Sequence, residues 1–194
     1  MTTQSPVLSA IPGYVAGAWD IDPVHSEASF VIRHMVVSKV RGRFDKFEGT
    51  IVTAEDPLRS SVEATIDAGS INTNQDQRDD HVRSADFLDV ENHPAITFRS
   101  TGLRPVGDDD FALDGDLTIR GVTKPVTLDL EVNGFTPDAW GGTRVGFSAS
   151  TDINRTDFGV SYNGPIPGAD SAMVLSDKVT LNLEIEAVLR QPAS

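Results

Sequence analysis

Hydrophobic and polar residues alternate along most of the chain, most clearly near the C-terminus. There, Val179, Leu181, Leu183 and Ile185 are each followed by a polar residue. A period of two places successive side chains on opposite faces of a β-strand, so one face is apolar and the other is solvated. The same pattern recurs in the runs 62–66, 96–98, 111–117, 126–132 and 145–149.

Clusters of turn-forming residues separate these runs. They include Glu55-Asp56-Pro57, the segment 107–110, Asn133-Gly134 and Gly141-Gly142. Many one-sided strands at short spacing predict an antiparallel barrel or sandwich, because a parallel sheet is buried on both faces. The chain therefore reads as all-β, with a flexible lead-in over 1–17, a single domain over 18–190 and a tail over 191–194.

One segment breaks the alternation and is dense in charge. Residues 75–84 contain acidic residues early and Arg83 near the end, which suits the dipole of a helix, and Asn74 is a residue that caps helices well. The sequence predicts one short helix here, at the rim of the barrel.

The inward-facing residues of the predicted strands are of mixed size. Large side chains such as Phe30 and Phe98 occur beside small ones such as Ala64 and Ala149. An eight-stranded barrel is just wide enough for side chains to fill it or for one small ligand to occupy it. The pattern leaves both outcomes open, a packed core and a hollow barrel.

Composition narrows the function. Twenty-nine Asp and Glu against sixteen Lys and Arg give a net charge of -13, which disfavours nucleic acid and anionic lipid surfaces as partners. The chain has no cysteine, so thiolate metal sites are excluded. The N-terminal residues lack the basic start and apolar run of a signal peptide, and no stretch approaches the ~20 apolar residues of a membrane span. These features predict a cytoplasmic protein without stable membrane insertion.

Candidate chemistry is sparse. The four histidines, at 25, 34, 81 and 93, show no two-histidine spacing for a metal, and neither a nucleophile elbow nor a phosphate loop is present. We therefore expect no catalytic residues, no metal and no cofactor. Arg78, His81 and Arg83 form the densest ionisable cluster. They are candidates for binding a polar head group or, with a slight preference, for ion pairs that fix the helix. Arg155 has the same two interpretations.

Six motifs in order resemble the YceI-like polyisoprenoid-binding family. The segment 19–30 is similar to the family's W-x-x-D-x-x-H-S-x-x-x-F opening, and 40–49 to its V-x-G-x-F-x-x-F-x-G hairpin. The segments 70–73 and 78–90, then 93–98, 115–126 and 153–159, also match in register. The resemblance covers residues 19 to 189.

The resemblance implies an extended, eight-stranded, lipocalin-like barrel with an apolar tunnel, and a homodimer. It implies that the ligand is a polyisoprenoid or an isoprenoid quinone, bound for transport or storage. On the predicted inward phase, the expected tunnel-lining residues are Phe30, Ile32, Phe98, Phe111, Leu117, Phe147, Leu181 and Leu183. The candidates for contact with the ligand head group are His25, His34, Arg78, His81 and Arg155.

Two other functions stay open at this stage. The barrel could be the reaction chamber of an enzyme acting on isoprenoid or quinone lipids, with a histidine as acid or base. It could instead be a packed, ligand-free, stress-related dimer. A filled interior would favour the packed dimer, and a hollow interior would favour the carrier or the enzyme.

Overall fold

The structure is a computed structural model that describes residues 11–168 and 173–191. Residues 1–10 of the predicted lead-in (1–17) and residues 192–194 of the predicted tail (191–194) therefore lie outside the described residues. The described part holds one α-helix, α1 (Asp76–Arg83), and three short 3-10 helices, η1 (Pro57–Arg59), η2 (Ala68–Ser70) and η3 (Arg155–Phe158). Its strands are β1 (Gly17–Ile21), β2 (Glu27–His34), β3 (Ser38–Phe44), β4 (Phe47–Thr53), β5 (Ser61–Asp67), β6 (Ile71–Asn72), β7 (Ala95–Pro105), β8 (Asp110–Ile119), β9 (Val122–Pro137), β10 (Thr143–Asn154) and β11 (Leu175–Leu189).

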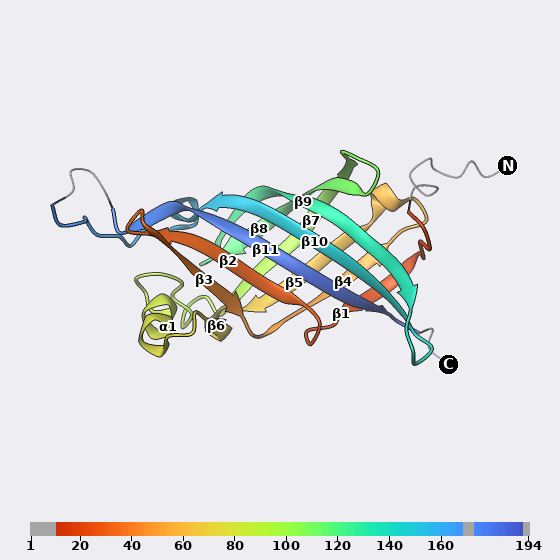
Figure 1. The fold of residues 1–194 in the computed structure, drawn as a ribbon, viewed down its shortest axis with the longest axis horizontal. Helices are drawn as coiled ribbons and strands as arrows, with labels where there is room; N and C mark the ends of the chain where they lie inside the picture. The colour runs from red at the N-terminus through yellow and green to blue at the C-terminus, as the bar shows by residue number, and fades with distance from the viewer. Residues whose placement is uncertain (1–10, 169–172, 192–194) are drawn as a thin grey trace.

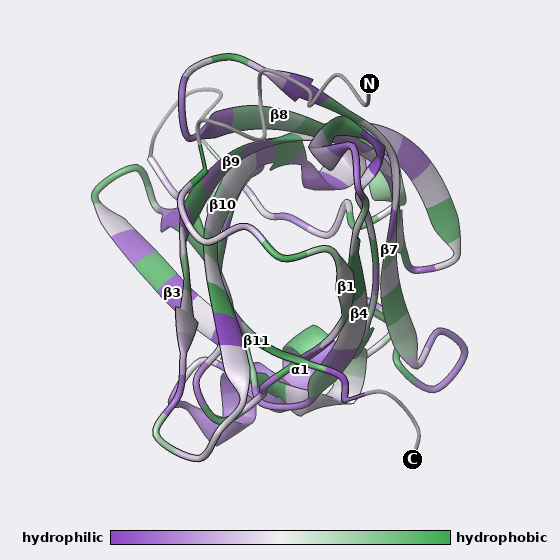
Figure 2. Cartoon of the chain, turned by 90° about the vertical axis from the view of Figure 1, so that its right-hand side faces the viewer, coloured by the Kyte–Doolittle hydropathy of each residue, from purple (hydrophilic) through white to green (hydrophobic). Residues whose placement is uncertain are grey.

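Eight of these strands close into an antiparallel barrel. They follow the order β1-β4-β5-β7-β8-β9-β10-β11, and the pairing of β1 with β11 completes the ring. The predicted all-β, eight-stranded barrel with one short helix is confirmed. Figure 2 looks along this barrel and shows the strands as a ring, with hydrophobic and hydrophilic segments alternating along them.

Strand β11 has two partners on one of its edges. Its last residues pair with β1, through Trp19 opposite Leu189, and its first half pairs with β2, through Phe30 opposite Leu181. Strand β2 then pairs with β3, and β3 pairs briefly with β6. This β2-β3-β6 extension and α1 lie at one end of the barrel, while β1 and the end of β11 lie toward the other (Figure 1).

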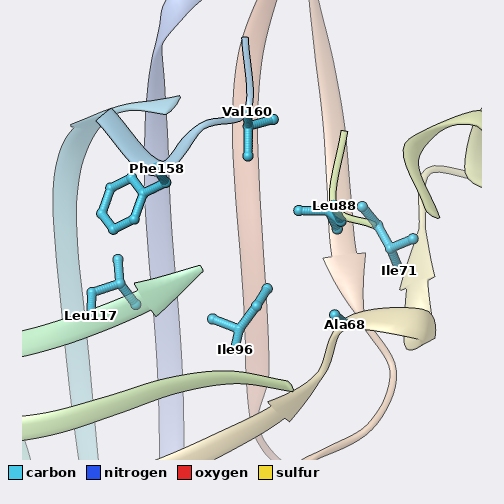
Figure 3. Packing of buried hydrophobic residues seen from close by; sticks show 7 residues of the cluster. All are labelled: Ala68, Ile71, Leu88, Ile96, Leu117, Phe158 and Val160. Carbon is cyan, nitrogen blue, oxygen red and sulfur yellow. The ribbon is translucent and has the colours of Figure 1, made fainter. Parts of the chain in front are cut away.

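Two buried clusters occupy different parts of the barrel. One surrounds Trp19, which is fully buried and donates from Nε1 to Thr53 Oγ1 at 2.8 Å. The other gathers residues from several strands, η2 and the segments after α1 and η3, as Figure 3 shows: Ala68, Ile71, Leu88, Ile96, Leu117, Phe158 and Val160. Because the two clusters lie apart, the interior between them need not be filled.

The helix forms where the sequence predicts it, but its cap differs. Helix α1 is capped by Gln75, whose side chain accepts from the backbone N–H of Arg78. Asn74, the expected cap, instead has a φ of +61°, a left-handed conformation that asparagine tolerates. The buried Asp79 accepts hydrogen bonds from the backbone N and the Oγ1 of Thr73 and so ties the helix to the preceding segment.

The predicted turn at Asn133-Gly134 is wrong. Strand β9 runs through these residues, and its register with β10 shifts between Gly146 and Phe147. Gly134 has a φ of +138°, which a glycine adopts at a β-bulge. An Asn-Gly pair suits both a hairpin turn and a bulge, so the sequence alone did not separate them.

Residues 11–16, assigned to the lead-in, pack against the barrel. Ile11 is buried, and Tyr14 donates from its hydroxyl to the carbonyl of Ala54 at 2.7 Å. The Tyr14 ring also contacts Phe135, with the ring centroids 5.2 Å apart.

Candidate functional site: an apolar cavity in the barrel

The barrel encloses a cavity of about 570 Å³. Its wall is formed almost entirely by aliphatic and aromatic side chains from strands all around the ring. The wall includes Tyr14, which precedes β1, and Pro57 of η1, as well as the paired residues His34 of β2 and Leu175 of β11. A volume of this size is typical of small-molecule sites, which are mostly apolar with few polar groups.

The inward phase deduced from alternation agrees with this wall. All eight residues expected to line a tunnel belong to it: Phe30, Ile32, Phe98, Phe111, Leu117, Phe147, Leu181 and Leu183. The small residues Ala28, Ala64 and Ala149 line the same space, so it stays hollow where larger residues would fill it. Their contact with a ligand stays a prediction.

Arg155 is the most unusual polar group of the wall. Its side chain is only 5% exposed. Nε donates to the carbonyl of Ser176 at 2.9 Å, and Nη1 donates to the carbonyls of Val160 and Tyr162 at 2.7 and 3.0 Å. Nη2 has no hydrogen-bond partner among the described residues, and the nearest carboxylate oxygen, on Asp177, is 3.6 Å away.

Nη2 of Arg155 is buried and has no hydrogen-bond acceptor among the described residues, which is costly for a charged N–H group. Burial lowers the pKa of this guanidinium, and the carboxylate of Asp177 opposes that shift. The sequence gives Arg155 two possible roles: its contacts are those of a residue that fixes the backbone, and contact with a ligand stays a prediction. Two of its nitrogens hold backbone carbonyls, and the third is unpaired.

Arg78 and His81 also belong to the cavity wall. Arg78 donates from Nε and Nη2 to Oγ1 and the carbonyl of Thr73, at 2.8 and 2.7 Å. His81 Nε2 lies 2.7 Å from a carboxylate oxygen of Asp86, and its ring meets Tyr162 edge-on. Arg83 donates hydrogen bonds to the carbonyls of Gly69 and Ile71 and to a carboxylate oxygen of Asp80. These contacts fix the backbone beside the helix.

Of the two remaining head-group candidates, only one faces the cavity. His34, at the end of β2, is part of the wall. His25 is not: it lies in the turn between β1 and β2, exposed, with Nδ1 2.8 Å from Asp22. The motif places His25 near the opening strand, but β1 ends at Ile21 and the turn directs the histidine outward. Placing His25 among the head-group residues was therefore a misjudgement of position.

Asp22, His25 and Glu186 have ligand atoms close enough together to suggest a metal site. However, Arg144 donates from Nη1 to both carboxylates, at 2.9 Å to Asp22 and in a very short contact to Glu186. A guanidinium therefore already supplies the positive charge that a cation would bring. We assign this cluster to the closure of the barrel, where it joins the β1–β2 turn to β10 and β11.

The alternation of hydrophobic and polar residues does not predict several of the residues that line the cavity. Tyr162 follows η3 in a segment without strand pattern, and Phe135 lies beyond the bulge at Gly134. If Asn133-Gly134 is taken as a bulge, the alternation of β9 predicts that Phe135 faces inward, as Val132 does. Tyr14 precedes the first strand, and only the packed structure shows its place in the wall.

A hollow, eight-stranded antiparallel barrel with an apolar interior is the architecture of lipocalin-like binding proteins. The family within this class follows from sequence. The chain belongs to the family of the YceI-like domain, whose profile matches residues 19–187. It is 39% identical over 178 residues to Protein YceI of Escherichia coli, covering 90% of this chain and 88% of that protein. A UPF0312 protein of Azotobacter vinelandii is 37% identical, over 87% of this chain and 84% of the relative.

Solved structures agree with the fold. The YceI protein of Campylobacter jejuni matches with a TM-score of 0.70 at 29% identity, over 82% of this chain and 91% of that one. A polyisoprenoid binding domain of Saccharophagus degradans matches with a TM-score of 0.69 at 18% identity, over 91% and 100%. The latter likeness concerns the fold alone. Within the described residues, the structure has no helix of the length and apolarity that a membrane crossing requires.

Proposed function

We propose that this chain binds a polyisoprenoid or an isoprenoid quinone inside the barrel, as a carrier or storage protein and not as an enzyme. The observation that carries the proposal is the apolar cavity with the unpaired Nη2 of Arg155 in its wall. Water satisfies an apolar cavity of this size poorly, so an apolar occupant is favoured. The Saccharophagus degradans domain, described as polyisoprenoid binding, makes this ligand class the first to test.

Hydrophobic burial is sufficient for useful affinity. An isoprenoid that buries on the order of 600 Å² gains roughly 15 kcal/mol before the costs of ordering and association are subtracted. The cavity also counts against the ligand-free alternative, which required a packed interior. Of the two alternatives to a carrier, only the enzyme remains compatible with a hollow barrel.

The first experiment identifies the occupant. Protein purified under native conditions is extracted with organic solvent, and the extract is analysed by mass spectrometry. We expect an isoprenoid lipid, recovered with its mass unchanged after prolonged incubation with the protein. A clean extract, together with failure to bind added polyprenols and quinones, would overturn the proposal, and a modified lipid would favour the enzyme.

A second experiment blocks the cavity. Ala64 lines it, whereas the neighbouring Thr65 is exposed on the outer face. Ala64→Trp should fill part of the cavity and abolish ligand retention, while Thr65→Trp should leave retention unchanged. Equal retention by both variants would show that the ligand binds elsewhere.

We further propose that an oxygen atom of the ligand's head accepts a hydrogen bond from Arg155 Nη2. Arg155→Lys keeps the charge but cannot reproduce the fork of donors. It should weaken binding of a polyprenyl phosphate or a quinone by about 1.5–3 kcal/mol, since a charge-assisted hydrogen bond is lost. Binding of an isoprenoid hydrocarbon without oxygen should not change. If both ligand types weaken together, Arg155 acts only through the structure of the wall.

The homodimer and the cytoplasmic location stay predictions. Light scattering on the eluted protein checks the first, and fractionation of the native host checks the second.

A further inference from the structure

Three consecutive apolar residues are exposed at the turn between β2 and β3. Met35, Val36 and Val37 are 41%, 65% and 86% exposed. We call them the apolar tip. The tip lies at one end of the barrel, on the side of α1 (Figure 1). Met35 donates from its backbone N to the carbonyl of Val174 at 2.7 Å, so the tip is held against the neighbouring segment, where Met173 is also exposed.

The backbone of the apolar tip is unfavourable for the residues it carries. Met35 and Val36 have φ values of +50° and +63°, in the left-handed region. Asparagine, aspartate or glycine is favoured at such left-handed positions, and a β-branched valine is strained there. An exposed valine gains no burial within the described structure, so no internal packing offsets this strain.

The charge around the apolar tip is opposite to that of the whole protein. Residues 28–44 contain Arg33, Lys39, Arg41 and Arg43 and no Asp or Glu, in a chain of net charge -13. Arg33 and Lys39 stand directly opposite each other across the β2–β3 pair, which is destabilising for like charges.

Among the described residues, only one of these four cations has an acidic partner. Arg43 pairs with Asp45. Arg33, Lys39 and Arg41 lie beyond 4.0 Å of every carboxylate in the part of the chain that the structure describes. We call these three residues the basic flank.

Two other exposed apolar residues, Val106 and Trp140, lie near acidic residues. Val106 precedes the run Asp108-Asp109-Asp110, and the backbone N of Trp140 donates to Asp138. Their surroundings would be repelled by an anionic surface. The apolar tip, by contrast, combines apolar side chains with cations that have no carboxylate partner in the described part of the chain, which is the pattern of segments that bind the interface of a membrane.

We propose that the apolar tip and the basic flank dock this protein on an anionic lipid surface. The tip enters the head-group region, and Arg33, Lys39 and Arg41 meet lipid phosphates. The net negative charge opposes this only weakly, because salt screens charges more than about 8 Å away. His34 and Val40 flank the tip in sequence and line the cavity, so docking brings that end of the cavity to the membrane. The docking itself does not depend on the ligand.

The test is cosedimentation with vesicles in about 0.15 M salt. We expect binding to vesicles of phosphatidylcholine with one third phosphatidylglycerol, and no binding to phosphatidylcholine alone. The triple variant Arg33→Gln, Lys39→Gln, Arg41→Gln should bind on the order of 100-fold more weakly, about fivefold for each charge near the surface. The control with the same charge change, Arg59→Gln, Arg99→Gln, Lys124→Gln, should bind within about threefold of the wild type.

The apolar part is tested separately. Val36→Asn, Val37→Ser should weaken vesicle binding at least about tenfold. It should keep or raise the Tm, because asparagine tolerates the turn, so a loss of binding is not a loss of fold. Val106→Ser is its control.

The proposal is overturned if the wild type ignores anionic vesicles, or if the tip variant or the triple variant of the basic flank binds them as the wild type does. A tip variant that turns a dimer into a monomer but still binds vesicles would assign the tip to a contact between two copies, and would overturn the proposal as well.

Discussion

The ring of Phe98, on β7, lies against Gly115, on β8, so closely that a Cβ added at Gly115 would stand 2.3 Å from Cζ of the ring. The same Cβ would be 2.8 Å from the backbone oxygen of Arg99. Glycine therefore lets the ring lie against the wall instead of crossing the cavity.

Gly115→Ala should displace the Phe98 ring and strain the wall, at a cost of about 1–3 kcal/mol. The Tm should fall by about 2–4 °C for each kcal/mol, and affinity for an isoprenoid should fall with it. Gly102→Ala is the control, because the nearest atom to its added Cβ is 3.9 Å away. An unchanged Tm and affinity for Gly115→Ala would contradict this account of the wall.

Phe98 and Thr97 are neighbours on opposite faces of β7. Phe98→Glu should place an unpaired carboxylate in the cavity, which costs several kcal/mol or raises the pKa of the new group. Thr97→Glu should cost less than about 1 kcal/mol, because its side chain is on the outer face. Urea unfolding of both variants measures the difference. Equal losses of stability in the two variants would mean that the inward-facing residues of β7 are assigned one position out of register.

Asp22 links stability to pH. Hydrogen bonds from His25, from Arg144 and from the backbone N of Val24 hold the pKa of the Asp22 carboxyl at about 2, below its ordinary value of 3.8, although burial opposes the shift. The folded state thus favours the ionised form. This contribution to stability is present above about pH 4 and is lost as the pH falls toward 2.

Asp22→Asn should therefore lower the Tm at neutral pH and reduce the fall in Tm between about pH 4 and pH 2. Asp129→Asn serves as the control, since Asp129 is exposed and has no hydrogen-bond or ion-pair partner among the described residues. Parallel pH profiles for the wild type and Asp22→Asn would refute the role of this carboxylate.

Arg83 holds two backbone carbonyls and should act on stability alone. Arg83→Met leaves the carbonyls of Gly69 and Ile71 without their donors, at a cost of about 1–3 kcal/mol for each group left buried and unpaired. Ligand affinity, measured well below the Tm, should stay within about twofold of the wild type. A large loss of affinity with an unchanged Tm would move Arg83 into the binding site.

Alternation was sufficient to predict which residues face inward, because a strand allows only two faces. The phase of Phe98, Leu117 and Leu183 follows directly from their polar neighbours. A hollow interior could not be predicted in the same way. It depends on whether Ala64 and Ala149, on separate strands, face one cavity, and strand order and shear decide that.

The polar contacts were harder to predict than the strands. Arg155 was recognised as a candidate, but its three carbonyl partners lie up to 21 residues away and are brought together only by the fold. His25 was misplaced because a motif gives spacing and not the direction of a turn. Asn74 and Gln75 can both cap a helix. The hydrogen bonds between the buried Asp79 and Thr73 place the start of the helix directly after Gln75.

The division of one edge of β11 between β1 and β2 means that a different strand pairs with β11 at each end of the barrel. The hydrogen bonds from Trp19 and its neighbours to the last residues of β11 keep the ring closed even if β2 separates from the first half of that strand. The ladder between β2 and β11 has seven residue pairs and the ladder between β1 and β11 has three, so the shorter ladder, beside the buried Trp19, closes the ring. The end that carries His34 is held instead by the longer ladder, so a different strand secures each end of the barrel against the same edge of β11.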